Sequence, residues 1–113
     1  MIFGSFTVTD EIVPDVNVFH PRDGFGELSI HEITCPGFRG GFLIHPGLPY
    51  NESDFYYYDK SGDILILLSG IFYNKTELSR QLGYEEGITD PELAARLFLS
   101  EGPLFAERLN GDF

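Results

Sequence analysis

The run Ile64-Leu65-Ile66-Leu67-Leu68 is apolar at five consecutive positions, and this stretch decides the fold. The segment 54–59 before it contains three consecutive tyrosines, and Lys60-Ser61-Gly62 between the two segments is typical of a turn. This order predicts a β-hairpin. A strand that is apolar on both faces must be covered on both faces. The sequence therefore predicts that the hairpin lies inside a layered structure.

The hydrophobic period changes after residue 73. Asn74, followed three residues later by Glu77, resembles a capping box, which predicts the start of a helix. Leu78 and Leu82 lie one turn apart and would form its apolar side. Gly83 is the expected end of this helix.

A second helix is predicted to begin at Asp90-Pro91, because an acidic cap followed by proline is a common start signal. Glu101-Gly102-Pro103 is expected to end it. The residues 104–109 predict one or two further turns. The apolar face of the second helix comprises Leu93, Ala94, Leu97 and Phe98. Because the strands precede the helices along the chain, the predicted fold class is α+β.

The first half of the chain shows strand and loop patterns. Residues 2–9 are rich in aromatic and β-branched side chains, which predicts a first strand. Residues 10–26 contain several Pro and Gly and predict a long loop, and residues 27–33 alternate only weakly between apolar and polar. Pro36-Gly37 predicts a turn, and residues 40–44 predict a short strand. We expect residues 1–113 to form one domain.

Composition excludes several classes of function. The chain has 18 acidic and 7 basic residues and a formal net charge of -11, which argues against binding of nucleic acid. No apolar run approaches the roughly 20 residues that span a membrane. Cys35 is the single cysteine, so no intrachain disulfide is expected, which indicates a cytoplasmic protein. The three histidines lack the short spacing of zinc sites, so no metal site is predicted.

Three segments in the second half carry a resemblance to a known family. Ser69-Gly70-Ile71-Phe72-Tyr73-Asn74 resembles the N-G-E-I-Y-N motif of class II glutamine amidotransferase domains of the asparagine synthetase-like family. Residues 89–92 resemble that family's S-D-T-E, and residues 107–113 resemble its E-R-L-N-G-x-F. The resemblance implies the N-terminal nucleophile (Ntn) hydrolase fold, a sandwich of two antiparallel sheets covered by helices. The family domain continues past the last motif, so we expect a fold shortened at its C-terminal end.

The nucleophile implied by the family is missing. In active members a cysteine is the first residue of the mature chain, and its own α-amine serves as the base. This sequence begins Met1-Ile2. Ser5 is an alternative nucleophile if the bond after Gly4 were cleaved, whereas its other interpretation is an ordinary residue of the first strand.

The remaining site residues are transferred by resemblance. The family's oxyanion hole would map onto Ser69, which replaces an asparagine, and onto the backbone N–H of Gly70. Ile71 replaces a glutamate that faces the substrate amine. Asp90 matches the aspartate that binds the glutamine ammonium, although a plain helix cap would also explain it. Arg39 is the remote candidate for the arginine that binds the substrate carboxylate.

Together these features predict a catalytically inactive glutaminase-like domain with a structural or a ligand-binding role. Its ligand would be a small amino acid held around Ser69, Gly70 and Asp90. ATP and magnesium are expected only in a C-terminal synthetase domain that this sequence lacks. The expected partners are a second copy of the chain or such a synthetase domain. The alternative is an active amidohydrolase that uses a processed Ser5.

Overall fold

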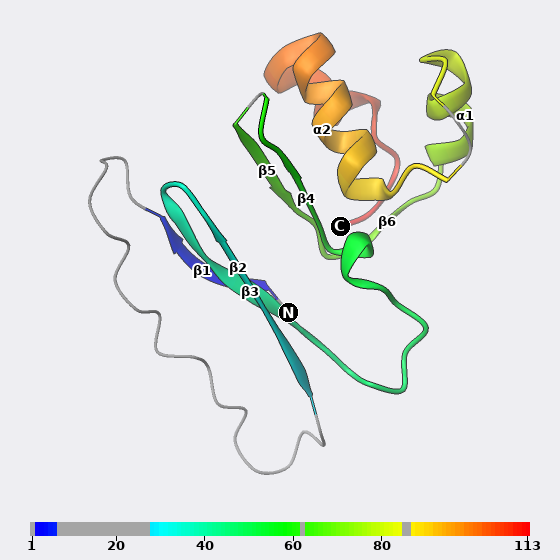
Figure 1. Ribbon diagram of the computed structural model, residues 1–113. Helices are drawn as coiled ribbons and strands as arrows, with labels where there is room; N and C mark the ends of the chain where they lie inside the picture. The colour runs from blue at the N-terminus through cyan, green and yellow to red at the C-terminus, as the bar shows by residue number, and fades with distance from the viewer. Residues whose placement is uncertain (1, 7–27, 62, 85–86) are drawn as a thin grey trace. The chain divides into compact units, whose positions relative to one another are not determined.

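The computed structural model describes residues 2–6, 28–61, 63–84 and 87–113 (Figure 1). The chain forms two compact units, residues 1–50 and residues 51–113, and each is described by itself. In the described residues, the first unit contains antiparallel strands, and α-helices occur only in the second unit. The predicted α+β class is therefore confirmed. The expected loop 10–26 lies outside the described residues.

The first unit contains a three-stranded antiparallel sheet. Its strands are β1 (Ile2–Phe6), β2 (Ser29–Cys35) and β3 (Phe38–Ile44), and their spatial order is β1-β3-β2. The strand predicted at residues 40–44 therefore exists and begins two residues earlier. Pro36-Gly37 connects β2 to β3 as the predicted turn. Across this hairpin His31 pairs with Phe42, and their rings stack with centroids 5.2 Å apart.

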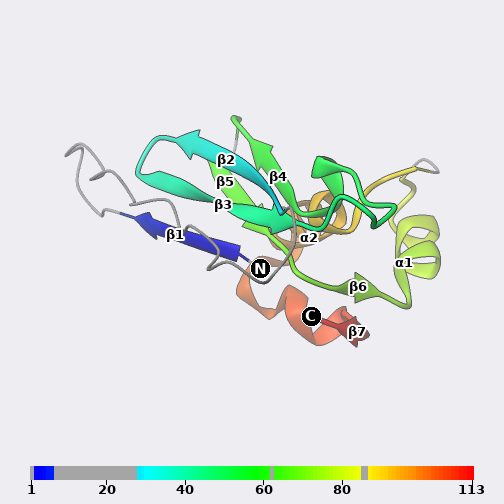
Figure 2. The same ribbon diagram turned by 90° about the horizontal axis from the view of Figure 1, so that it is seen from below.

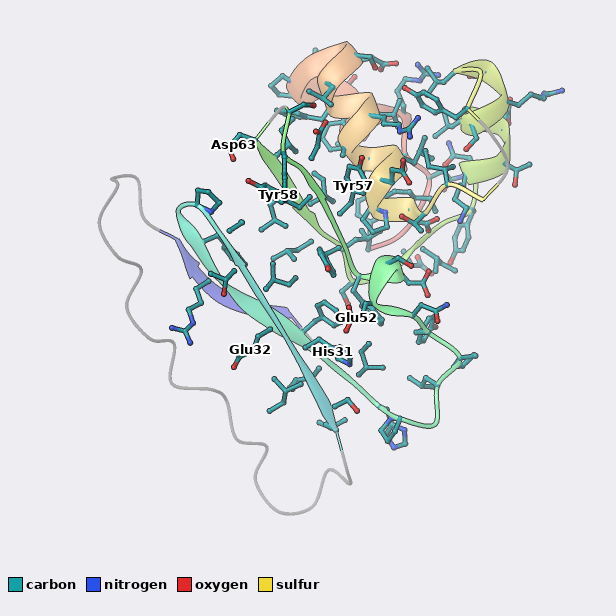
Figure 3. The ribbon with its side chains drawn as sticks, in the orientation of Figure 1. His31, Glu32, Glu52, Tyr57, Tyr58 and Asp63 are labelled. Atoms are coloured by element: carbon teal, nitrogen blue, oxygen red, sulfur yellow. The ribbon has the colours of Figure 1, made fainter. Side chains whose placement is uncertain are left out.

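The second unit begins with the predicted hairpin. After the short 3₁₀ helix η1 (Glu52–Asp54), β4 (Tyr56–Asp59) pairs antiparallel with β5 (Ile64–Leu67). Every residue of both strands is half-buried. The Asp59 carboxylate accepts a hydrogen bond from the Ser61 N–H at 2.8 Å, which stabilises the turn. Across the hairpin, the Tyr58 hydroxyl donates to Asp63 Oδ1 at 3.1 Å (Figure 3).

The first helix, α1 (Lys75–Gln81), ends where the sequence predicts. Gly83 follows it with a φ of 70°, a left-handed conformation that glycine adopts without steric cost. The Tyr84 N–H donates to Ser79 O at 2.9 Å, and the Gly83 N–H donates to Arg80 O at 3.3 Å. These two bonds form a Schellman motif, which satisfies carbonyls at the helix end.

The second helix, α2 (Asp90–Glu101), packs against β4 and β5 and stops at Gly102 as predicted. The 3₁₀ helix η2 (Gly102–Arg108) follows, and two short strands, β6 (Ile71–Phe72) and β7 (Gly111–Asp112), complete the unit (Figure 2). The core of this unit is one apolar cluster. It comprises Leu68, Phe72, Leu78, Ile88, Leu93, Ala94 and Leu97. No helix in the described part of the chain is long and apolar enough to cross a membrane.

Candidate functional site

Three segments far apart in the sequence meet in the second unit. β6 pairs antiparallel with β7, with Ile71 opposite Asp112 and Phe72 opposite Gly111. The Tyr73 N–H extends this pairing by donating to Asn110 O at 2.7 Å. Asp90, at the start of α2, also contacts β6, because its Oδ2 accepts from the Phe72 N–H at 2.8 Å. These segments are residues 69–74, 89–92 and 107–113, the three stretches that carry the family resemblance.

Two glycines allow β6 and β7 to approach closely. A Cβ atom on Gly70 would lie 2.0 Å from Asp112 O, and one on Gly111 would lie 2.1 Å from Ile71 O. Gly70 also has a φ of 152°, which L-residues rarely adopt. Any side chain at either position would therefore separate the two strands. The contact between β6 and β7 therefore requires both Gly70 of the first motif and Gly111 of the third.

The Asn74 side chain holds the third motif in place. Its Nδ2 donates to Arg108 O at 2.8 Å, and its Oδ1 accepts from the Asn110 N–H at 3.0 Å. The predicted capping box with Glu77 is therefore wrong. Asn74 precedes α1, but its side chain makes no cap bond because both its polar atoms bind the C-terminal segment.

Asp90 is enclosed by partners from the protein itself. Its Oδ1 lies 2.8 Å from the Lys75 Nζ, and only 12% of its side chain is exposed. Its Oδ2 binds the Phe72 N–H. Lys75 is the first residue of α1, where a cation opposes the helix dipole, so the Asp90 carboxylate offsets an unfavourable position. We call this set of three groups, the Asp90 carboxylate, the Lys75 ammonium and the Phe72 N–H, the Asp90 latch.

The N-cap of α2 is Thr89, one residue before the predicted cap at Asp90. Thr89 has an extended backbone, and its hydroxyl accepts from the Glu92 N–H at 3.4 Å. Asp90 is the first helical residue and Pro91 the second. Because Thr89 supplies the cap, the Asp90 carboxylate is left to bind Phe72 and Lys75.

The other predicted site residues differ in their surroundings. Ser69, Gly70 and Ile71 are exposed, and Ile71 presents an aliphatic side chain where the family motif has a carboxylate. Ser5 lies in β1 directly opposite Arg39 of β3. Both belong to the first unit, whereas Ser69, Gly70 and Asp90 belong to the second.

A further contact joins β6 to β7. The Tyr73 hydroxyl donates a short hydrogen bond to the Asp112 carboxylate. This bond, with a smaller effect of desolvation, raises the pKa of Tyr73 above its ordinary value. A tyrosine phenol is protonated at neutral pH even at its ordinary pKa of about 10, so the exposed hydroxyl serves as a donor there.

Sequence reasoning missed Lys75, which contacts the predicted site directly. A lysine in the first turn of a helix is the available signal, because the helix dipole disfavours it there. No group of three or more His, Cys, Asp or Glu side chains in the described residues could hold a metal ion. Comparisons with family models, curated proteins and solved structures returned no match.

Proposed function

We propose that this chain is a catalytically inactive glutaminase-like domain of an asparagine synthetase-like protein, and that its role is structural. The convergence of residues 69–74, 89–92 and 107–113 supports the resemblance. Segments that a family would preserve for one shared site are expected to meet in space, and these segments do. The Ntn sandwich belongs to the same proposal.

The Asp90 latch is the observation that carries the inactive interpretation. A carboxylate has about four acceptor sites, but only 12% of the Asp90 side chain is exposed, so a ligand ammonium would have to compete with the partners that the carboxylate already has. Here one oxygen binds the Phe72 N–H and the other binds the Lys75 ammonium. Displacing Lys75 would leave a cation without its partner at the N-terminus of α1.

The neighbouring positions also favour a structural role. Ile71 offers no polar group to a substrate amine, and the Ser69 hydroxyl is shorter than the asparagine side chain of the family motif. Removal of one oxyanion-hole donor reduces the rate of acyl transfer by roughly 10²–10³-fold. Such a domain would stabilise a synthetase domain or a second copy of itself by contact rather than by chemistry.

Glutamine hydrolysis tests the proposal. We expect the purified protein to release no glutamate or ammonia from L-glutamine above the level of a heat-denatured sample. Ser5→Ala serves as the matched variant. Release of both products by the wild-type protein would overturn the proposal, and its loss in Ser5→Ala would assign the activity to Ser5.

A further inference from the structure

A groove in the second unit lies beside the converging segments, and three of its polar side chains, Thr76, Glu77 and Arg80, take no part in the contacts that join those segments. The groove is open to solvent, and its volume of about 640 Å³ lies within the range of roughly 300–1,000 Å³ found for small-molecule sites. Its walls are formed by α1, by the two residues before α1 and by Asn110 of the C-terminal segment. The lining residues are Tyr73, Asn74, Thr76, Glu77, Arg80 and Asn110.

Arg80 is the cation of this groove. In the described residues of the second unit, Lys75, Arg96 and Arg108 each form an ion pair with a carboxylate. No such pair joins Arg80 to any described residue, and its side chain is exposed. A guanidinium carries five donors arranged to bind a carboxylate. In a protein of net charge -11, this group is therefore available to an external carboxylate.

Glu77 places a negative charge next to Arg80. The two residues are three positions apart on α1, so their Cβ atoms are about 5–6 Å apart. Glu77 Oε1 accepts from the Gln81 Nε2 at 3.0 Å. Its other oxygen has no hydrogen-bond partner among the described residues. Among the described residues no ion pair joins Glu77 to Arg80, so the groove offers one cation and one anion side by side.

The remaining walls complete a small polar site. The hydroxyl of Thr76 and the side-chain amide of Asn110 make no hydrogen bond to any described residue. Tyr73 is 59% exposed. Because its hydroxyl is held by Asp112, its ring is fixed as one side of the groove. An apolar group can pack on such a ring.

We propose that this groove binds a zwitterion, a free α-amino acid, with its carboxylate at Arg80 and its ammonium at Glu77. The ligand side chain packs on the Tyr73 ring. A simple anion would be repelled by Glu77 and by the net charge, and a simple amine would be repelled by Arg80, whereas a zwitterion satisfies both groups. The inference goes beyond the structural role proposed above and does not involve the Asp90 latch.

Titration of the isotope-labelled protein by NMR tests this site. The probe is L-leucine, compared with 4-methylpentanoate, which lacks its amine, and with isoamylamine, which lacks its carboxylate. We expect L-leucine to produce saturable shifts at residues 73–80 and 110, with a Kd on the order of 1 mM. Each half-probe is expected to bind at least about 10-fold more weakly, because one charged contact is lost.

Two variants and one control complete the test. Arg80→Gln and Glu77→Gln each weaken L-leucine binding by about 10-fold or more, whereas Lys60→Gln, which removes an exposed cation at the β4–β5 turn, leaves it unchanged. The proposal is overturned by an absence of saturable shifts, by equal binding of the half-probes to the wild-type protein, or by shifts confined to residues 71, 72 and 90. None of these outcomes depends on glutamine hydrolysis, so the two proposals fail separately.

Discussion

Single residues in the second unit gain their roles from partners that are distant in the sequence. The Asp90 carboxylate reaches Phe72, 18 positions earlier, and the Asn74 amide reaches Arg108, 34 positions later. Local signals indicated caps at both positions, because Asp and Asn are common cap residues. Tertiary partners took over both side chains. Residue identities therefore predicted which positions matter but not which atoms they bind.

The Tyr73–Asp112 hydrogen bond predicts a dependence of stability on pH. Because the pKa of Tyr73 is raised in the folded protein, the native state holds the phenol proton more tightly than the unfolded chain does. The contribution of this hydrogen bond to the free energy of unfolding is complete below the pKa of about 10 that tyrosine has in the unfolded chain. It is lost as the pH rises through the higher pKa of the folded protein.

NMR of isotope-labelled tyrosine rings measures this pKa directly. We expect Tyr73 to titrate above an unstructured tyrosine, and we expect Asp112→Asn to lower its midpoint. Tyr73→Phe identifies the signal. A Tyr73 midpoint that is the same with and without the Asp112 carboxylate would show that the bond does not form in solution.

Elements were predicted well where the chain itself provides the signal. The β4–β5 hairpin, the Schellman end of α1 and the end of α2 at Gly102 all follow from local turn and cap chemistry. β6 and β7 were not predicted, because each contains only two residues and is a strand only by virtue of its pairing with the other. Their pairing depends on the glycines at positions 70 and 111, which a local pattern cannot connect.

Replacement of Asn74 tests the attachment of the C-terminal segment. Asn74→Ala removes both bonds that hold Arg108 and Asn110, and we expect the free energy of unfolding to fall by about 1–2 kcal/mol. Asn110→Ala is the matched control, since its side chain makes no hydrogen bond to the described residues. Urea unfolding measures both variants. Equal stability of the two variants would contradict the role given to Asn74.

At the scale of the whole molecule, the sequence predicted the α+β class because the predicted strands precede the predicted helices along the chain. The ligand-binding role of the candidate site stays a prediction, whereas the contact between its segments is observed. The resemblance selected Gly70 and Asp90, which lie on segments that meet, but it could not indicate that Lys75 neutralises Asp90. That pairing depends on the relative placement of α1 and α2, which no local pattern encodes.

The most direct test of the account is the stability of Asp90→Ala, measured by urea unfolding beside Glu107→Ala, an exposed carboxylate without a hydrogen bond to the described residues. If the Asp90 carboxylate is structural, its removal is expected to lower the free energy of unfolding by about 1.5–3 kcal/mol, because the Phe72 N–H and the Lys75 ammonium lose their partner. Removal of a carboxylate that serves ligand binding instead commonly leaves the stability of the free protein unchanged or increases it. The account predicts a clear loss of stability for Asp90→Ala alone. Unchanged or increased stability would contradict it.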